Sequence, residues 1–257
     1  MKPGKRIHAV SIIFLVCLFT AIAAVAVYTV LDSPVDPVGK DTLFTVSRGS
    51  SVLAITAALE NQSLIRSSFF ASVLTRLNKF SIKAGTYRIS PQLRTTAILD
   101  LLHEGAEETL RVTVPEGLTI TKTARLLEEA GVVSRLAFEQ ACRNPEVISR
   151  FGIPATSVEG FLFPDTYTFR YGVDAAEVVA TMVSNFFLKT ADLDTLPESR
   201  EKLFEKVILA SIVEREYRVA REAPLIASVF SNRLKIGMGL QSCSTVEYII
   251  TEIQGKP

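Results

Sequence analysis

The chain has 257 residues, of which 48% are hydrophobic, and its 28 basic and 27 acidic side chains give a net charge of +1. This length suits one or two domains, and a nearly neutral chain without a basic stripe interleaved with aromatic residues excludes nucleic acid as a partner. Two histidines and three scattered cysteines, with no Cys-x-x-Cys or His-Glu-x-x-His pattern, exclude a zinc site, and we expect no metal and no other cofactor.

The N-terminal segment 1–31 predicts a membrane anchor. Three basic residues precede an apolar run from 7 to 31, which is long enough for a bilayer-spanning helix of about 20 residues. Basic residues before the run and Asp32 after it place the N-terminus in the cytoplasm and the rest of the chain outside the cytoplasmic (inner) membrane. The alternative is a signal peptide cleaved after Ala24-Val-Ala26, but the apolar stretch continues past that site, which favours an uncleaved single-pass anchor.

Residues 32–41 hold two prolines, a glycine and three aspartates, which predicts a short stiff linker. The unit that follows, 42–109, has the predicted order strand, helix, helix, strand, and then a third helix. We expect these elements at 43–47, 52–60, 67–77, 82–89 with Gly85 at the bend, and 94–103. Such a unit resembles LysM-like modules, which bind the N-acetylglucosamine-containing chains of peptidoglycan and chitin. A plain spacer is the alternative, because many small α+β units share this order.

The second unit, 110–257, begins with a strand that runs into a Pro-Glu-Gly turn. Helices are expected at 119–130, 135–142, 144–150 and 174–190. Between the third and the fourth lies the segment 159–169, in which four aromatic residues alternate around Pro164 and Asp165. This pattern suits an extended segment at the wall of a groove, and an edge strand that packs its rings into the core explains it equally well.

A helical run over 200–217, which repeats apolar residues at helical spacing without a glycine or proline, ends with two carboxylates, Glu214 and Glu216. At about 100° per residue, Glu214 falls on the apolar stripe and Glu216 points the opposite way, so the two cannot share one role. A carboxylate in apolar surroundings is expected to have a raised pKa, which keeps the proton that a general acid needs. The plainer alternative is a core helix with a charged end, in which Glu214 pairs with an arginine.

Beyond this helix we expect another over 224–234, then a loop over 235–246 with two glycines, a glutamine and several hydroxyls. Such a loop brings backbone and side-chain donors close to a polar ligand, or is simply a turn. The last residues, 251–257, contain no evident closing element. Cys142 and Cys243 are expected to be free thiols, since nothing in their spacing suggests a disulfide framework.

Taken together, these segments resemble the endolytic murein transglycosylase family, also called YceG-like. The resemblance implies an α+β protein with an N-terminal transmembrane helix, the LysM-like unit and an α+β catalytic domain over 110–257. The motifs that carry it occur in the family's order and spacing: Val114-Pro-Glu-Gly117, Glu159-Gly-Phe-Leu-Phe-Pro-Asp-Thr-Tyr167, Ala210-Ser-Ile-Val-Glu-Arg-Glu216, Val229-Phe-Ser-Asn-Arg-Leu234, and Gly237-Met-Gly-Leu-Gln241 with Thr245-Val246.

The family cleaves peptidoglycan glycan strands between N-acetylmuramic acid and N-acetylglucosamine without water, so that the resemblance implies the same lyase activity here. The 6-hydroxyl of the muramic acid attacks its own anomeric carbon and leaves a 1,6-anhydro end, so one carboxyl group can serve as acid and then as base. By family position this residue is Glu216. The helical spacing instead singles out Glu214 as the carboxyl group in apolar surroundings. We follow the resemblance and expect Glu216 to face a cleft, where bound sugar raises its pKa. Glu214 is then expected to orient the site.

The resemblance also implies supporting residues. Gln241 and Thr245 are expected to hold acetamido or hydroxyl groups of the substrate, and Asn232 to brace the loop. Within the aromatic motif, Glu159, Asp165 and Tyr167 are the further supporting or substrate-binding candidates.

The chain departs from the family pattern in two places. Cys243 and Ser244 stand where the family commonly has Asp and Pro. A Ser-Pro-Tyr-Asn-Thr-Tyr run and a Gly-Leu-Pro-Pro-Gly stretch that complete the family's cleft are absent, which predicts a catalytic domain that is incomplete at its C-terminus.

Three other functions stay open at this stage. The first is a non-catalytic, membrane-anchored peptidoglycan-binding protein. The second is an assembly scaffold, and the resemblance also implies peptidoglycan synthases as neighbours. The third is a hydrolase that uses water, which needs a second acidic residue in the cleft and has Asp165 as its only obvious candidate.

Overall fold

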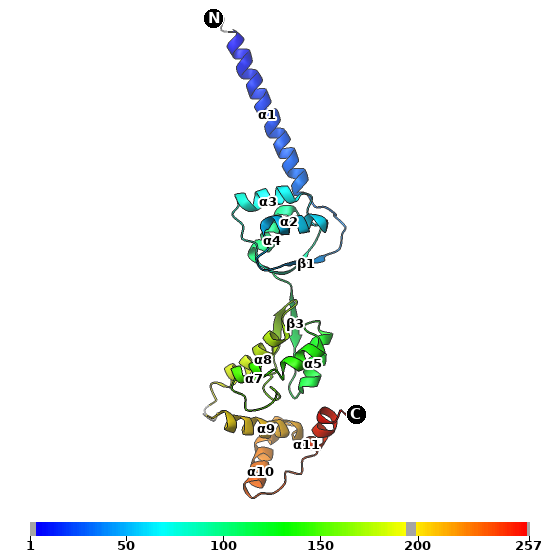
Figure 1. The fold of residues 1–257 in the computed structure, drawn as a ribbon, viewed down its shortest axis with the longest axis vertical. Helices are drawn as coiled ribbons and strands as arrows, with labels where there is room; N and C mark the ends of the chain where they lie inside the picture. Colours follow the sequence, from blue (N-terminus) through cyan, green and yellow to red (C-terminus); the bar gives the residue numbers. More distant parts are fainter. Residues whose placement is uncertain (1–3, 194–198, 256–257) are drawn as a thin grey trace. The chain divides into compact units, whose positions relative to one another are not determined.

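The structure, a computed structural model, describes residues 4–193 and 199–255 (Figure 1). Lys2 of the basic N-terminus and the last two residues of the chain therefore lie outside the described residues. The chain divides into two compact units, Met1–Glu108 and Thr109–Pro257, which are considered separately below.

The first element, α1 (Gly4–Asp32), is the helix predicted for the anchor. Its segment Ile13–Asp32 has 20 residues with a mean hydropathy of 2.6, and residues 13–30 are all exposed. At about 1.5 Å per residue this is long enough for the hydrocarbon core of a bilayer, and the helix is consistent with membrane anchoring.

The first unit has the predicted order of elements: β1 (Thr42–Val46), α2 (Val52–Asn61), α3 (Ser68–Leu77), β2 (Gly85–Ile89) and α4 (Thr95–Glu104). The strands pair antiparallel, with Thr42 opposite Ile89 and Val46 opposite Gly85. Both α2 and α3 are capped at their N-termini, because the hydroxyls of Ser51 and Ser67 accept the backbone N–H groups of Ala54 and Phe70.

The core of this unit lies between the inner face of the sheet and the three helices. Its buried residues are Phe44, Val46, Ile55, Leu59, Leu64, Ile65, Ala71, Leu74, Tyr87, Ile89, Ile98, Leu99 and Leu102. Strand residues alternate between the two faces, so Phe44 and Val46 point to the helices while Thr45 points away.

The start of the predicted linker is fixed to this unit. Asp32 is buried, and its carboxylate accepts the backbone N–H of Thr96 at 2.9 Å and the Thr96 hydroxyl at 3.2 Å, at the beginning of α4. Arg66 donates to the Ser33 hydroxyl at 3.0 Å and to the Pro34 carbonyl at 2.6 Å. The end of α1 is thus attached to the folded unit by charge-assisted hydrogen bonds.

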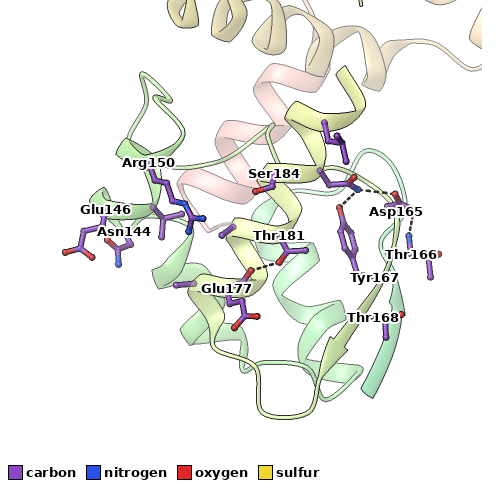
Figure 2. A pocket seen from close by; sticks show the side chains of 15 residues that line it. Asn144, Glu146, Arg150, Asp165, Thr166, Tyr167, Thr168, Glu177, Thr181 and Ser184 are labelled. Atoms are coloured by element: carbon purple, nitrogen blue, oxygen red, sulfur yellow. Dashed lines mark hydrogen bonds between the residues drawn. The ribbon is translucent and has the colours of Figure 1, made fainter. Parts of the chain in front are cut away.

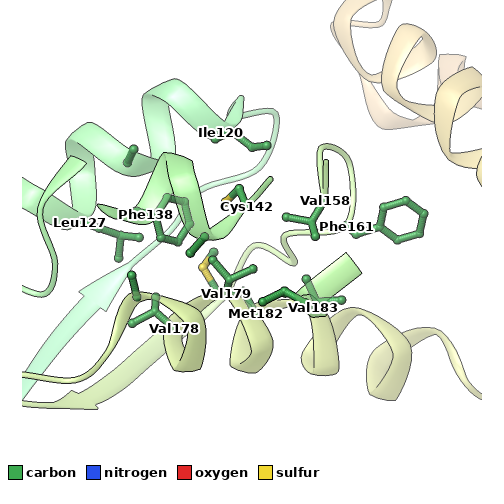
Figure 3. Close-up of a cluster of buried hydrophobic side chains, with 14 of the residues drawn as sticks. Ile120, Leu127, Phe138, Cys142, Val158, Phe161, Val178, Val179, Met182 and Val183 are labelled. Atoms are coloured by element: carbon green, nitrogen blue, oxygen red, sulfur yellow. The ribbon is translucent and has the colours of Figure 1, made fainter. Parts of the chain in front are cut away.

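The second unit begins with β3 (Thr109–Thr113), which pairs antiparallel with β4 (Thr166–Arg170). The predicted helices are present as α5 (Ile120–Glu129), α6 (Arg135–Ala141), α7 (Pro145–Arg150) and α8 (Ala175–Thr190). Figure 3 shows the core between them, where side chains of α5, α6 and α8 meet around Cys142. Phe161, Tyr167 and Phe169 are buried in this core, so the interpretation in which the aromatic motif packs its rings inward is confirmed for these three.

Helix α9 (Arg200–Glu216) joins this core to a second, smaller cluster. Leu203 belongs to the first core, with Phe204 and Val207 packed against it, whereas Ile212 and Val213 pack against Phe230. The residues after α9 form η1 (Ala220–Glu222), α10 (Ala223–Lys235), α11 (Cys243–Tyr248) and η2 (Ile249–Ile253).

One expectation about this last region is wrong. The predicted loop over 235–246 ends early, because α11 begins at Cys243, and η2 continues the helical turns to Ile253. The physical reason is that residues 243–253 contain no glycine or proline, so once the extended Ser242 starts the turn nothing in the sequence interrupts it.

Candidate active site

Glu216 is the last residue of α9, and its side chain is exposed. The hydroxyl of Ser242, at the start of α11, donates to Glu216 Oε1. The hydroxyl of Ser244 lies 2.6 Å from that of Ser242, so a chain of two hydroxyls ends on the carboxylate. The chain's turn through α10 therefore brings two segments that are far apart in sequence together at the end of α9.

The hydrogen bonds from Ser242 and Ser244 lower the pKa of Glu216 below the ordinary glutamate value. The raised pKa expected from the apolar helical run is therefore wrong for this residue in the structure. The cause is that Glu216 points away from the apolar stripe, so hydroxyl donors stabilise its charge and little burial opposes them.

Glu214 lies on the other side of α9 and is half-buried, as the helical spacing predicts. Its carboxylate accepts the Tyr217 hydroxyl at 2.7 Å, so its partner is a tyrosine and not the arginine of the plainer interpretation. Gly117 lies against Glu214, since a Cβ atom built at this glycine would be 3.9 Å from Glu214 Cγ. The Pro-Glu-Gly turn and the α9 motif, far apart in sequence, thus adjoin at Glu214.

The loop that carries the predicted substrate ligands is braced by Arg233, whose Nη1 donates to the carbonyl of Leu240 at 2.6 Å. The contact lies next to Asn232, the predicted brace, whose backbone carbonyl accepts the N–H of Ile236. Gln241 is exposed with a φ of +55°, and the hydroxyl of Thr245 donates to the carbonyl of Ser242 at 2.7 Å. These contacts hold the loop beside Glu216.

Glu159 is the carboxyl group whose pKa is raised, and burial is the main cause. It accepts the backbone N–H of Ile120 at 3.1 Å, at the start of α5, and the Tyr248 hydroxyl lies 3.5 Å from its Oε2. Next to it, the hydroxyl of Thr119 donates to Glu252 at 3.0 Å. Glu159 therefore links the aromatic motif to α5 and to the end of α11.

Asp165 and Tyr167 lie in a separate pocket of about 1130 Å³, formed by α7, α8 and β4 (Figure 2). Asn185 donates to the carboxylate of Asp165 at 3.0 Å and to the Tyr167 hydroxyl at 3.2 Å, and Lys189 lies 3.9 Å from the same carboxylate. Hydrogen bonds from Asn185 and Thr166 lower the pKa of Asp165. No residue of α9, α10 or α11 lines this pocket in the described part of the chain, so Asp165 is not brought to Glu216.

Comparison with known proteins supports the family to which the sequence motifs point. The sequence model of the YceG-like family matches residues 44–257. The chain belongs to the YceG-like family. The resemblance stated from the motifs is thereby confirmed.

Two curated proteins named endolytic murein transglycosylase are similar to this YceG-like chain. The protein of Bacillus subtilis strain 168 is 28% identical over 239 residues, which cover 84% of this chain and 66% of that protein. The protein of Streptococcus pneumoniae strain R6 is 26% identical over 253 residues, which cover 85% of this chain and 45% of that protein. The chain thus spans about half to two thirds of the length of these relatives.

A crystal structure of a putative YceG-like protein from Listeria monocytogenes has the same fold. It superposes with a TM-score of 0.50 and 24% sequence identity, and the match covers 84% of this chain and 76% of that chain.

Sequence reasoning missed four residues that make the contacts around Glu214, Glu216 and the following loop: Ser242, Ser244, Tyr217 and Arg233. For Tyr217 a signal was present, because residues three apart on a helix adjoin and Tyr217 follows Glu214 at that spacing. For Ser242 the only signal was the richness of the loop in hydroxyls.

We expect Ser242→Ala to raise the pKa of Glu216 towards the ordinary glutamate value, because it removes the donor that contributes most to the lowered pKa. A carboxylate with a lowered pKa stabilises the folded state above the ordinary glutamate pKa, and this contribution is lost as the pH falls through the lowered value. The variant should therefore lose most of this pH-dependent contribution, because only Ser244 is left to lower the pKa of Glu216. Carbon-13 NMR titration of the Glu216 carboxyl measures the shift. Ser211→Ala, which removes a hydroxyl bonded to Ile208 on the same helix, is the matched control and should leave the titration unchanged.

Proposed function

We propose that this chain is a membrane-anchored lytic transglycosylase that cleaves peptidoglycan glycan strands, with Glu216 as its single acid and base. The observation that carries the proposal is the placement of Glu216, exposed at the end of α9 and facing the hydroxyls of the following loop. Membership of the YceG-like family and the names of the curated relatives support the choice of substrate and reaction.

The proposed reaction needs one carboxyl group. Protonated Glu216 gives its proton to the glycosidic oxygen between N-acetylmuramic acid and N-acetylglucosamine, and the bond from this oxygen to the anomeric carbon breaks. The 6-hydroxyl of the muramic acid then bonds to that carbon and returns a proton to Glu216, so that a 1,6-anhydro end forms and no water is consumed. An inverting or retaining hydrolase instead needs a second carboxylate, and Asp165 lies in the separate pocket.

The hydrogen bonds that lower the pKa of Glu216 stabilise its ionised form, which is the form that accepts a proton in the second half of this reaction. The first half needs the protonated form. Sugar bound over Glu216 removes water from it and competes for the Ser242 hydroxyl, and both effects raise its pKa. Gln241 and Thr245, on the loop beside Glu216, are the groups we expect to contact the acetamido or hydroxyl groups of the substrate.

In this proposal the first unit is a glycan-binding module of the LysM-like kind, because it has the strand, helix, helix, strand order of those modules. With α1 in the cytoplasmic membrane and both units outside it, the enzyme acts on strands near the membrane, where peptidoglycan synthases work. The second candidate function is a non-catalytic peptidoglycan-binding protein. The ionised state that the lowered pKa gives Glu216 favours this alternative, since an ionised carboxylate cannot act as an acid.

Mass spectrometry of products tests the proposal. The full-length chain in detergent is incubated with purified glycan strands, and fragments with 1,6-anhydro ends are expected. Fragments with reducing ends would replace the proposal by a hydrolase that uses water. Binding of strands without any fragment would establish the non-catalytic alternative.

A further inference from the structure

Helix α3 carries an apolar stripe on its outward face. Phe69 and Leu77 are 78% and 73% exposed, and Val73 between them is also exposed. These three residues are spaced four apart, so they lie above one another on one side of the helix. Large apolar side chains in a continuous exposed row mark a surface that contacts something other than water.

The inward face of α3 is only partly polar. Ala71 and Leu74 belong to the core of the first unit, and Ser72 and Thr75 are buried beside them. Both hydroxyls are satisfied: the Ser72 hydroxyl lies 2.8 Å from that of Thr56, and the Thr75 hydroxyl donates to the Ala71 carbonyl at 2.8 Å. A helix at a protein–water boundary normally has polar side chains on its outward face. The apolar residues on both faces of α3 therefore indicate that the surroundings on its outer side are apolar as well.

The end of the membrane helix lies against the same element. Tyr28 of α1 and Phe70 of α3 make an edge-to-face ring contact with centroids 5.4 Å apart. Tyr28 is four residues before Asp32, where the apolar segment ends and where hydrogen bonds attach α1 to α4. A tyrosine at this position of a spanning helix lies at the level of the lipid headgroups, so α3 begins at that level too. Figure 1 shows α3 beside the end of α1.

The charges on α3 complement a membrane surface. The helix contains no acidic residue, and Arg76 and Lys79 are exposed at its C-terminal end. Bacterial and other cytoplasmic membranes carry anionic headgroups, which attract basic side chains that flank an apolar helical face.

We propose that α3 lies in the surface of the membrane that α1 crosses, with Phe69, Val73 and Leu77 at the boundary between headgroups and acyl chains. The inference rests on the proposed membrane anchor, and it adds a second attachment that fixes the orientation of the first unit on the bilayer. Continuity with the apolar surface of α1 and the basic residues beside the stripe favour lipid over a second copy of the chain as the occupant.

The chain has no tryptophan, so a single introduced tryptophan reports its own surroundings. The full-length Phe69→Trp variant is reconstituted in vesicles of phosphatidylethanolamine and phosphatidylglycerol, with and without lipids brominated in the acyl chains. We expect its emission to move to shorter wavelength and to lose intensity in brominated lipid. Thr45→Trp is the matched control in the same unit, because Thr45 is exposed on the face of the sheet that points away from the helices, and its emission should do neither.

Each other outcome would overturn the inference. If Phe69→Trp emits like Thr45→Trp while the chain resists extraction with alkaline carbonate, the anchor is right and the docking of α3 on the membrane is wrong. A shift to shorter wavelength without loss of intensity in brominated lipid would mean that protein covers the stripe. Release of the chain by alkaline carbonate would refute the anchor, and the inference with it.

Discussion

Replacing Glu216 by Gln is expected to slow glycan-strand cleavage by about 10²–10⁴-fold, the usual contribution of a positioned general acid or base. The amide has nearly the shape of the carboxylic acid, and its oxygen still accepts the Ser242 hydroxyl, so the loop beside α9 should keep its place. The amide neither gives a proton to the leaving oxygen nor takes one from the attacking hydroxyl. Cleavage is followed as the rate of appearance of anhydro ends, and strand binding is measured separately.

Glu205→Gln is the control for this prediction, because Glu205 is exposed on the same helix and far along it from the Ser242 contact. It should cleave at the parental rate. If Glu216→Gln kept the parental rate as well, the proton would have to come from another carboxyl group. Glu214, which adjoins the Pro-Glu-Gly turn, would then be the residue to replace next.

Local features of the chain were predictable from the sequence. The spacing of apolar residues placed α9 to within a residue, and it also predicted that Glu214 is half-buried and that Glu216 is exposed. The predicted starts of α2, α3 and α8 at 52, 67 and 174 also lie within one residue of the observed ones, where Ser51, Ser67 and Asp174 cap the helices. These features depend on neighbours within one or two turns, which the sequence contains.

Contacts between distant segments were not predictable. The Ser242 hydroxyl reaches Glu216 because the chain reverses through α10, and the direction of the Glu216 pKa shift follows from that contact and not from the helical run. In the same way, the aromatic motif could line a groove or fill the core until the pairing of β3 with β4 placed Tyr167 and Phe169 inside. Periodicity says which residues share a face, but only the tertiary fold says what lies opposite that face.

Gly160→Ala is expected to destabilise the second unit by about 2–4 kcal/mol, through two costs that add. Gly160 has a φ of +84°, a conformation that a residue with a Cβ adopts only with strain. A Cβ at this position would also lie 2.7 Å from Val207 Cγ1, so Val207 and the α9 backbone that carries it must move. Since α9 ends at Glu216, the variant should lose cleavage activity together with stability.

Gly131→Ala separates the two costs. Gly131 has a φ of +72°, and a Cβ built there meets nothing within 4 Å, so this variant should show only the conformational cost of about 1–2 kcal/mol. Adding Val207→Ala to Gly160→Ala removes the methyl group that clashes. The double variant should therefore be more stable than the sum of the two single changes predicts.

The buried thiol of Cys142 provides the measurement. Its backbone carbonyl accepts the N–H of Val158, two residues before Gly160, and burial raises the pKa of the thiol, so it stays protonated and reacts with maleimide only when the core opens. The labelling rate of the Cys142 peptide, followed by mass spectrometry in the same chain, reports the opening free energy, while the exposed Cys243 reacts at once. Equal rates for Gly160→Ala and Gly131→Ala would show that the close approach of Gly160 to Val207 does not hold α9 in place. A much faster rate for Gly160→Ala, reversed by Val207→Ala, would show that this approach positions the helix that carries Glu216.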